Sequence, residues 1–292
     1  MCRFVYYLGP RITLGSLVTE PDHSLIHQSY HAREREEPLN GDGFGVAWYD
    51  VETPDYPVVF KEVMPAWSSI NLYSLAPTTR SHCLLAHIRA ATPGLAVTQL
   101  NCHPFRRGRL SFMHNGEVAG FRSVRRRLLA ELSDEQYQRI ESTGDSEVVF
   151  ALAMDRLADL DHAPNTEDLA GALLQTSALT ERVAMEADLG APSYLNLVLT
   201  DGHRAAITRY VTPGGEHRAQ TLYYQVGSHY RCENGICMMD DVITDERTIL
   251  VSSEPLSEES GWKPVPVNHV LLIDRDRDLE LRPIETPRSL AA

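Results

Sequence analysis

The apolar positions change their spacing twice along the chain. In the first part they form short runs separated by turn residues, a pattern typical of strands. We predict strands at 3–7, 46–49, 58–63, 83–88 and 110–113, with a turn at Gly9–Pro10 ending the first strand. The second and third of these strands are expected to pair as a hairpin.

Helical spacing replaces this pattern in the middle of the chain, where we predict helices at 123–132, 146–160 and 165–188. The second helix carries a stripe of apolar residues at the spacing of a helix that is buried on one side: Val148, Val149, Leu152, Ala153, Leu157 and Leu160. Thr166 is the predicted N-cap of the third helix.

Strand-like spacing returns beyond Pro192, at 194–199, 205–210, 221–226, 248–251 and 270–273. Asp201–Gly202 predicts a hairpin turn between the first two of these strands. Strands, then helices, then strands predict an α+β fold in which helices cover two sheets. We expect one domain over residues 2–283 and a tail at 284–292.

Composition and charge narrow the class of protein. The 292-residue chain has a formal net charge of −13, which argues against nucleic acid or an anionic membrane as a partner. It has no run of about 18 apolar residues, and Arg3, Pro10 and Arg11 interrupt a signal-peptide pattern. We therefore expect a cytoplasmic protein. An odd number of cysteines, five, without a signal peptide predicts reduced thiols.

Cys2 directly follows the initiator Met, which aminopeptidases remove when the next side chain is small. The mature chain would then begin with a thiol, of pKa about 8.5, and an α-amine of pKa about 7.7–8.0. One residue would thus supply both a nucleophile and a general base, as in N-terminal Thr and Ser hydrolases. The alternative is that Cys2 is a small apolar residue opening a buried strand.

Three later segments place polar groups next to predicted elements. Arg89 and Thr92 follow a strand and could grip a carboxylate, or Arg89 could form a salt bridge there. Asn115 and Gly116 offer a side-chain amide and a backbone N–H, the two donors of an oxyanion hole, or else form a hairpin turn. Asp145 could bind an ammonium group or could stabilise the start of a helix.

Two other candidate sites are disfavoured. The glycines of 41–45 precede a strand rather than a helix, so they favour a tight turn or a close backbone approach over phosphate binding. The histidines and cysteines of 82–103 lack the spacing of a zinc site, as does the pair Cys232 and Cys237. We expect neither a metal nor a cofactor.

The order of the candidate residues resembles class II glutamine amidotransferases of the N-terminal-nucleophile hydrolase superfamily. The matching positions extend over essentially the whole chain: Cys2, Arg89 in an H-x-R-x-x-T context, Asn115–Gly116 after His114, and Asp145 before a helix. Residues 40–46, 101–105 and 252–256 resemble a stand-alone branch of that family. This branch includes ergothioneine-pathway γ-glutamyl hydrolases and the amidotransferase-like subunit of the fungal glutathione-degrading complex.

The resemblance implies a four-layer αββα sandwich and a role for each matched residue. Cys2 would attack the γ-carbonyl of a γ-glutamyl group, with its own amine moving the proton. Asn115 and the Gly116 amide would stabilise the oxyanion. Arg89 and Thr92 would hold the α-carboxylate of the substrate, and Asp145 its α-ammonium.

The chain also departs from part of the family. Enzymes of the glucosamine-6-phosphate synthase type carry Trp and His around the positions of Ala90 and Pro93, so contacts to the leaving group must differ. Candidates for those contacts are Phe44, Trp67 and His103. The synthase domain is absent, so ammonia channelling within this chain is not expected.

Three functions follow from these observations. The first is hydrolysis of a γ-glutamyl amide, with glutathione, a related γ-glutamyl compound or glutamine as substrate. The second is a glutaminase subunit that passes ammonia to a separate synthetase. The third is a γ-glutamyl-binding protein that retains Met1 and has no activity. A peptidase or synthetase subunit is the expected kind of protein partner for the active forms.

Overall fold

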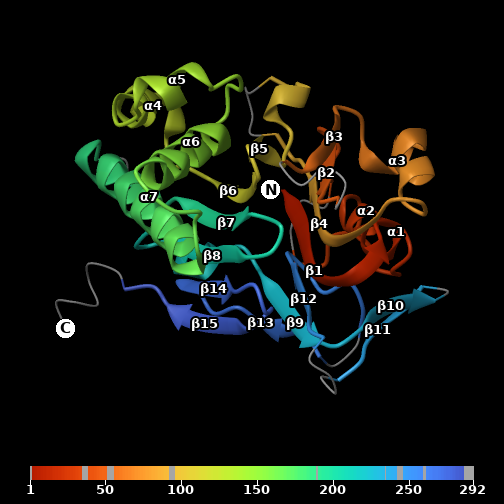
Figure 1. Ribbon diagram of the computed structural model, residues 1–292. Coiled ribbons are helices and arrows are strands. Elements are labelled where there is room, and N and C mark those ends of the chain that lie inside the picture. The colour runs from red at the N-terminus through yellow and green to blue at the C-terminus, as the bar shows by residue number, and fades with distance from the viewer. Residues whose placement is uncertain are drawn as a thin grey trace.

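Two antiparallel sheets form the centre of the molecule (Figure 1). The computed structural model describes residues 2–34, 39–50, 56–91, 96–188, 190–233, 235–241, 246–258 and 261–285. Within these ranges one sheet has seven strands, in the order β13 (Lys263–Pro264), β9 (Tyr223–Gly227), β12 (Thr248–Ser252), β1 (Arg3–Thr13), β4 (Arg80–Ile88), β2 (Phe44–Trp48) and β3 (Val58–Glu62). The other has six, in the order β15 (Leu279–Pro283), β14 (His269–Ile273), β8 (Ala205–Val211), β7 (Tyr194–Thr200), β6 (Leu110–Glu117) and β5 (Phe105–Arg107).

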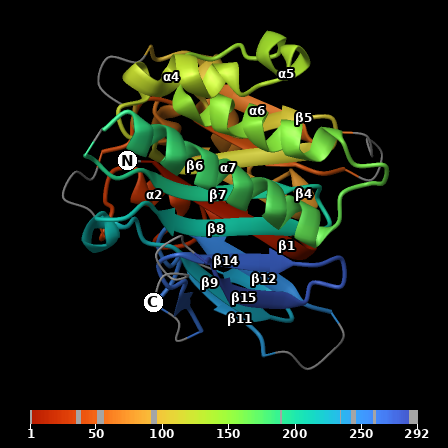
Figure 2. The same ribbon diagram turned by 90° about the vertical axis from the view of Figure 1, so that its left-hand side faces the viewer.

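Helices cover the outer face of each sheet. Over the six-stranded sheet lie α4 (Phe121–Ala130), α6 (Asp145–Ala158) and α7 (Thr166–Glu186), with α5 (Asp134–Gln138) beside α6 (Figure 2). Over the seven-stranded sheet lie α1 (Gly15–Val18), α2 (Leu25–Gln28) and α3 (Ile70–Leu75) (Figure 1). The short 3-10 helices are η1 (Ala66–Ser68), η2 (Gln99–Asn101) and η3 (Glu216–Arg218).

Three apolar cores separate these four layers, one between each helical layer and its sheet and one between the sheets. Side chains of β1 alternate between two of the cores, as a strand buried on both faces requires. Phe4 and Tyr6 pack between the sheets, whereas Val5 and Tyr7 pack toward α1 and α2. The predicted α+β class and the αββα arrangement are confirmed.

Most predicted elements are confirmed, including the hairpins β2–β3 and β7–β8. The predicted turn at Gly9–Pro10 is wrong, because β1 continues to Thr13 with a register shift between Leu8 and Ile12. The shift accommodates Pro10, which has no N–H to give to a regular ladder.

The predicted cap of α7 is wrong by one residue. The cap is Asn165, whose side chain accepts from the Asp168 N–H while the Asp168 carboxylate accepts from the Asn165 N–H. These reciprocal bonds form a capping box and satisfy backbone donors at the start of the helix.

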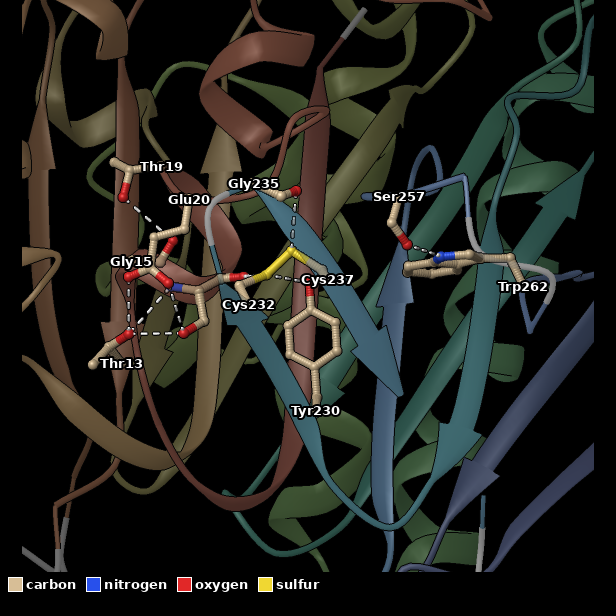
Figure 3. The surroundings of a disulfide bond; sticks show 11 residues. Thr13, Gly15, Thr19, Glu20, Tyr230, Cys232, Gly235, Cys237, Ser257 and Trp262 are labelled. Carbon is tan, nitrogen blue, oxygen red and sulfur yellow. Dashed lines mark hydrogen bonds between the residues drawn. A yellow bond between two sulfur atoms is a disulfide. The ribbon is translucent and has the colours of Figure 1, made fainter. Parts of the chain in front are cut away.

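The prediction of reduced thiols is wrong for one pair, Cys232 and Cys237, which form a disulfide (Figure 3). They lie directly opposite each other in the hairpin of β10 (Tyr230–Glu233) and β11 (Ile236–Met239), with Cα atoms 4.1 Å apart. This pairing in space is not visible in the sequence spacing. Cys2, Cys83 and Cys102 are not disulfide-bonded, as predicted.

No helix in the described ranges is both long enough and apolar enough to span a membrane. The same ranges contain no group of three or more His, Cys, Asp or Glu side chains that could hold a metal ion.

Candidate active site

A small cavity lies where the start of β1, the end of β4, the segment before β5, strand β6 and the start of α6 meet. Four of the predicted site residues line it, namely Cys2, Arg89, Gly116 and Asp145. The other lining residues are Ala90, Asn101, His103, Phe105, His114, Ser142, Gly144 and Ser146. Groups from both sheets and from a helix therefore face one space, with one cation and one carboxylate among them.

Cys2 is held at the cavity through the main chain of its neighbours. Its Sγ lies 3.6 Å from the carbonyl oxygen of Ala90, and the Arg3 guanidinium donates to the Cys2 carbonyl at 3.3 Å. Arg3 points to the opposite face of the sheet, where it pairs with Glu254 at 2.7 Å. The Cys2 side chain is half-buried, so its thiol remains accessible from the cavity.

Arg89 follows β4 and is 5% exposed. Its guanidinium donates to the carbonyls of Asp42 at 3.4 Å and Ala96 at 3.3 Å, and among the described residues it forms no ion pair. The alternative of a salt bridge at the strand end thus has no partner in that part of the chain. Thr92 lies outside the described residues.

Asn115 and Gly116 lie within β6 rather than after it, so the hairpin-turn alternative is wrong. A Cβ on Gly116 would overlap the Tyr194 carbonyl, so only glycine allows this approach of β6 to β7. The Asn115 side chain is fully buried and donates to Ser253 Oγ at 3.3 Å, and Ser253 Oγ also accepts from the Phe4 N–H. Asn115 thus links β6, through Ser253, to Phe4 of β1, two residues beyond Cys2, and it is not among the residues that line the cavity.

Asp145 is the first residue of α6, and Gly144 occupies the N-cap position without a side-chain cap. One carboxylate oxygen of Asp145 accepts from the Val118 N–H at 2.7 Å, and the other accepts from Ser146 Oγ at 3.1 Å. Ser146 Oγ also lies 3.0 Å from His114 Nδ1. The helix start and β6 therefore orient the carboxylate, whose negative charge suits the N-terminal end of the helix dipole.

A family model, that of class-II glutamine amidotransferases, matches residues 16–289. The chain belongs to the class II glutamine amidotransferases. The match covers most of the chain, and the positions quoted above lie in the order that the resemblance requires.

Individual relatives support this membership. The amidotransferase is 38% identical to a Saccharomyces cerevisiae protein named "Probable glutamine amidotransferase DUG3", over 97% of this chain and 84% of the yeast protein. It is 27% identical to a γ-glutamyl-hercynylcysteine sulfoxide hydrolase of Mycolicibacterium smegmatis, over 97% of this chain and 100% of the relative.

Solved structures agree with the fold. A glutamine aminotransferase class-II domain protein from Silicibacter pomeroyi superimposes with a TM-score of 0.66 and 26% identity, covering 98% of this chain and 100% of that chain. The glutamine phosphoribosylpyrophosphate amidotransferase of B. subtilis has a TM-score of 0.57 at 14% identity, covering 98% of this chain and 50% of its own. The latter likeness concerns the fold alone.

Two buried imidazoles of the amidotransferase lie beside the cavity in uncharged form. Burial lowers the pKa of His103 well below its ordinary 6.5 and lowers the pKa of His87 to about 3. The two rings are 4.2 Å apart, and His103 Nδ1 accepts from the His114 N–H. His103 lines the cavity, as one of the three leaving-group candidates. Phe44 does not, because it is buried in the core beneath α1 and α2.

Sequence reasoning missed Asn101 and Ser146. Asn101 belongs to the Asn-Cys-His-Pro-Phe segment that supported the family resemblance. That motif indicated the family but not a role for Asn101. Ser146 gave no signal beyond its place next to Asp145. Trp67, the third leaving-group candidate, packs edge-on against Tyr30, with ring centroids 6.0 Å apart, and it is not among the residues lining the cavity.

Proposed function

We propose that this amidotransferase hydrolyses a γ-glutamyl amide through a thioester on Cys2. The observation that carries the proposal is that Cys2, Arg89, Gly116 and Asp145 line one cavity. A γ-glutamyl head is a zwitterion, so it requires one cation and one anion near a nucleophile. Arg89 would bind its α-carboxylate and Asp145 its α-ammonium. Thr92 would share the carboxylate, as the family pattern implies.

The reaction has two balanced stages. After Met1 is removed, the Cys2 thiol attacks the γ-carbonyl carbon and its proton passes to the free α-amine. The N–H of Gly116, a residue that lines the cavity, would stabilise the oxyanion. The family pattern assigns the second donor to the Asn115 amide, which would turn from Ser253 Oγ toward the oxyanion. The C–N bond then breaks, and the ammonium returns the proton to the leaving amine. Water attacks the thioester in the second stage, releasing glutamate and restoring the thiol.

We propose glutathione or a related γ-glutamyl compound as substrate. Support comes from the name of the Mycolicibacterium smegmatis relative, which describes a hydrolase of a γ-glutamyl compound. The yeast relative is named a glutamine amidotransferase, which supports a second candidate, a glutaminase subunit that delivers ammonia to a separate synthetase. A peptidase subunit would be the partner in the first case and a synthetase in the second.

The test is a glutamate-release assay with purified protein whose Met1 removal is established by intact mass. Glutathione, glutamine and γ-glutamyl peptides are each offered alone. Cys2→Ala should abolish release while leaving the circular dichroism spectrum unchanged. The double variant Cys232→Ser/Cys237→Ser, which alters two cysteines of the remote β10–β11 hairpin, serves as the control and should retain turnover.

The outcomes separate the candidates. Release from glutathione or a γ-glutamyl peptide by the chain alone supports the hydrolase. Release from glutamine that rises only with a synthetase and its acceptor supports the ammonia-delivering subunit. Absence of release from every compound, with or without a partner, leaves the binding protein and refutes both.

A further inference from the structure

Asn101, the last residue of η2, connects the two charged sides of the cavity. Asn101 is 5% exposed and lines the cavity. Within the described ranges its side chain bonds to Ala96 and Thr143, and it makes no hydrogen bond to Cys2, Asn115 or Gly116. We propose that Asn101 is a positioning residue that sets the separation between Arg89 and Asp145, and with it the affinity for the γ-glutamyl head. This inference rests on the proposed function.

On one side Asn101 reaches a backbone carbonyl that also binds Arg89. Its Nδ2 donates to the carbonyl of Ala96 at 2.7 Å, and the Arg89 guanidinium donates to the same carbonyl at 3.3 Å. The two side chains therefore share one acceptor. Moving Asn101 would move the Ala96 carbonyl and remove one of the two bonds that fix the guanidinium.

On the other side Asn101 holds the segment that leads into α6. Its Oδ1 accepts from the Thr143 N–H at 3.0 Å, and its Nδ2 lies 3.1 Å from Thr143 Oγ1. Thr143 is two residues before Asp145. Gly144 provides no side-chain cap at the start of α6. Glu147 accepts from the backbone N–H groups of Glu141 and Ser142, and Asn101 adds a second anchor, at Thr143, from a different part of the chain.

Asn101 can act as an anchor because the residues after it are tightly packed. A Cβ on Gly43 would lie 2.7 Å from Cys102 Sγ, and a Cβ on Gly45 would overlap the His103 carbonyl. His103 is further held by the His114 N–H. Residues 101–103 are thus fixed against β2 and β6. The Asn101 side-chain amide, held by this packing, in turn fixes the positions of Arg89 and Asp145.

The experiment compares wild type with Asn101→Ala, Thr143→Ala and the control Asn71→Ala. Asn71 is an asparagine of α3 whose side chain donates to Glu62, and it is not among the residues that line the cavity. The measurements are KM and kcat for the γ-glutamyl substrate, the inhibition constant of L-glutamate, and the rate of Cys2 alkylation by iodoacetamide. Loss of these three hydrogen bonds should raise KM and the inhibition constant about tenfold or more in Asn101→Ala.

The same variant should keep kcat within about threefold and leave the alkylation rate unchanged, because the nucleophile is held through other contacts. Thr143→Ala keeps the backbone N–H and should give a smaller rise in the same constants. Asn71→Ala should match wild type. In a double-mutant cycle, Asn101→Ala and Asp145→Asn should be non-additive in their effect on the inhibition constant.

Two results would overturn the inference while wild type remains active. One is an unchanged inhibition constant for glutamate in Asn101→Ala. If Asn101→Ala does not fold, the deciding result is instead an unchanged inhibition constant for glutamate in Thr143→Ala. An inactive wild type would instead overturn the proposed function, so the two failures are distinct.

Discussion

Replacing Glu254 by Gln tests whether one buried carboxylate holds the start of β1 in place. Its side chain is 1% exposed and receives four donors. Arg3 and His23 bind it at 2.7 and 2.8 Å, and the backbone N–H groups of Arg33 and Glu34 bind it at 2.9 and 3.2 Å. Arg3, which is equally buried, also donates to the Cys2 carbonyl, so the carboxylate stabilises the segment that carries the candidate nucleophile.

The loss of unfolding free energy expected in Glu254→Gln can be worked out in two ways. Burial alone would raise the pKa of Glu254, but the His23 hydrogen bond, the Arg3 charge and the two backbone donors outweigh it and lower the pKa from 4.5 to about 2. That difference corresponds to roughly 3 kcal/mol of folding free energy. The second way uses the general cost of breaking a buried ion pair. Leaving the buried Arg3 guanidinium without its carboxylate partner costs about 3–5 kcal/mol. We therefore expect Glu254→Gln to lose about 3–5 kcal/mol at pH 7.

The pH dependence has a definite sign. Because the pKa is lowered in the folded state, the stabilisation is fully present above the unfolded value near 4.5 and is lost as the pH falls toward about 2. The difference in unfolding free energy between wild type and Glu254→Gln should thus be largest near pH 7. It should shrink progressively between about pH 5 and pH 2.

Urea unfolding followed by circular dichroism at pH 7, 5, 4 and 3 measures this difference. Glu258→Gln is the matched control, because Glu258 is 84% exposed and pairs with Arg33 on the surface. It should change the unfolding free energy by less than about 1 kcal/mol. A loss of under about 1 kcal/mol in Glu254→Gln at pH 7, or a loss that does not vary with pH, would refute the reasoning.

Three further substitutions test other contacts. Asn165→Ala removes the capping box of α7 and should lower the unfolding free energy by about 1 kcal/mol, whereas the exposed neighbour Glu167→Gln should cost less, as read from urea midpoints. Cys232→Ser/Cys237→Ser opens a short loop and should cost about 2 kcal/mol with kcat unchanged, and an equal midpoint in wild type with and without reductant would contradict this. Gly45→Ala places a methyl group on the His103 carbonyl and should lower the melting temperature sharply. Gly171→Ala is the control, because its added methyl group meets only the end of the Gln175 side chain, at 4.0 Å, and its backbone is not in the left-handed region.

Local patterns predicted the elements well and their ends less well. Spacing identified α6 and the strand pair β7–β8 because each depends on near neighbours in sequence. Pro10 misled the prediction of β1, since a register shift within a sheet can absorb a proline that in isolation marks a turn. The pair Cys232 and Cys237 misled the prediction of thiol state, because its bond depends on cross-strand register rather than on spacing.

The arrangement of the site shows where such reasoning ends. Once β1 and β4 are known to pair with Arg3 opposite Ile88, the chain itself places Cys2 beside Arg89, which is a matter of register within one sheet. Gly116 belongs to the other sheet and reaches the same cavity only through the packing of the core between the sheets. Asp145 reaches it through a helix start that is anchored by Asn101 from a third segment. No periodicity encodes these last two contacts, and only the ordered family motif could have indicated them. Residues that fix such contacts without touching substrate, as Asn101 is proposed to do, are therefore the ones that a search for chemically reactive side chains passes over.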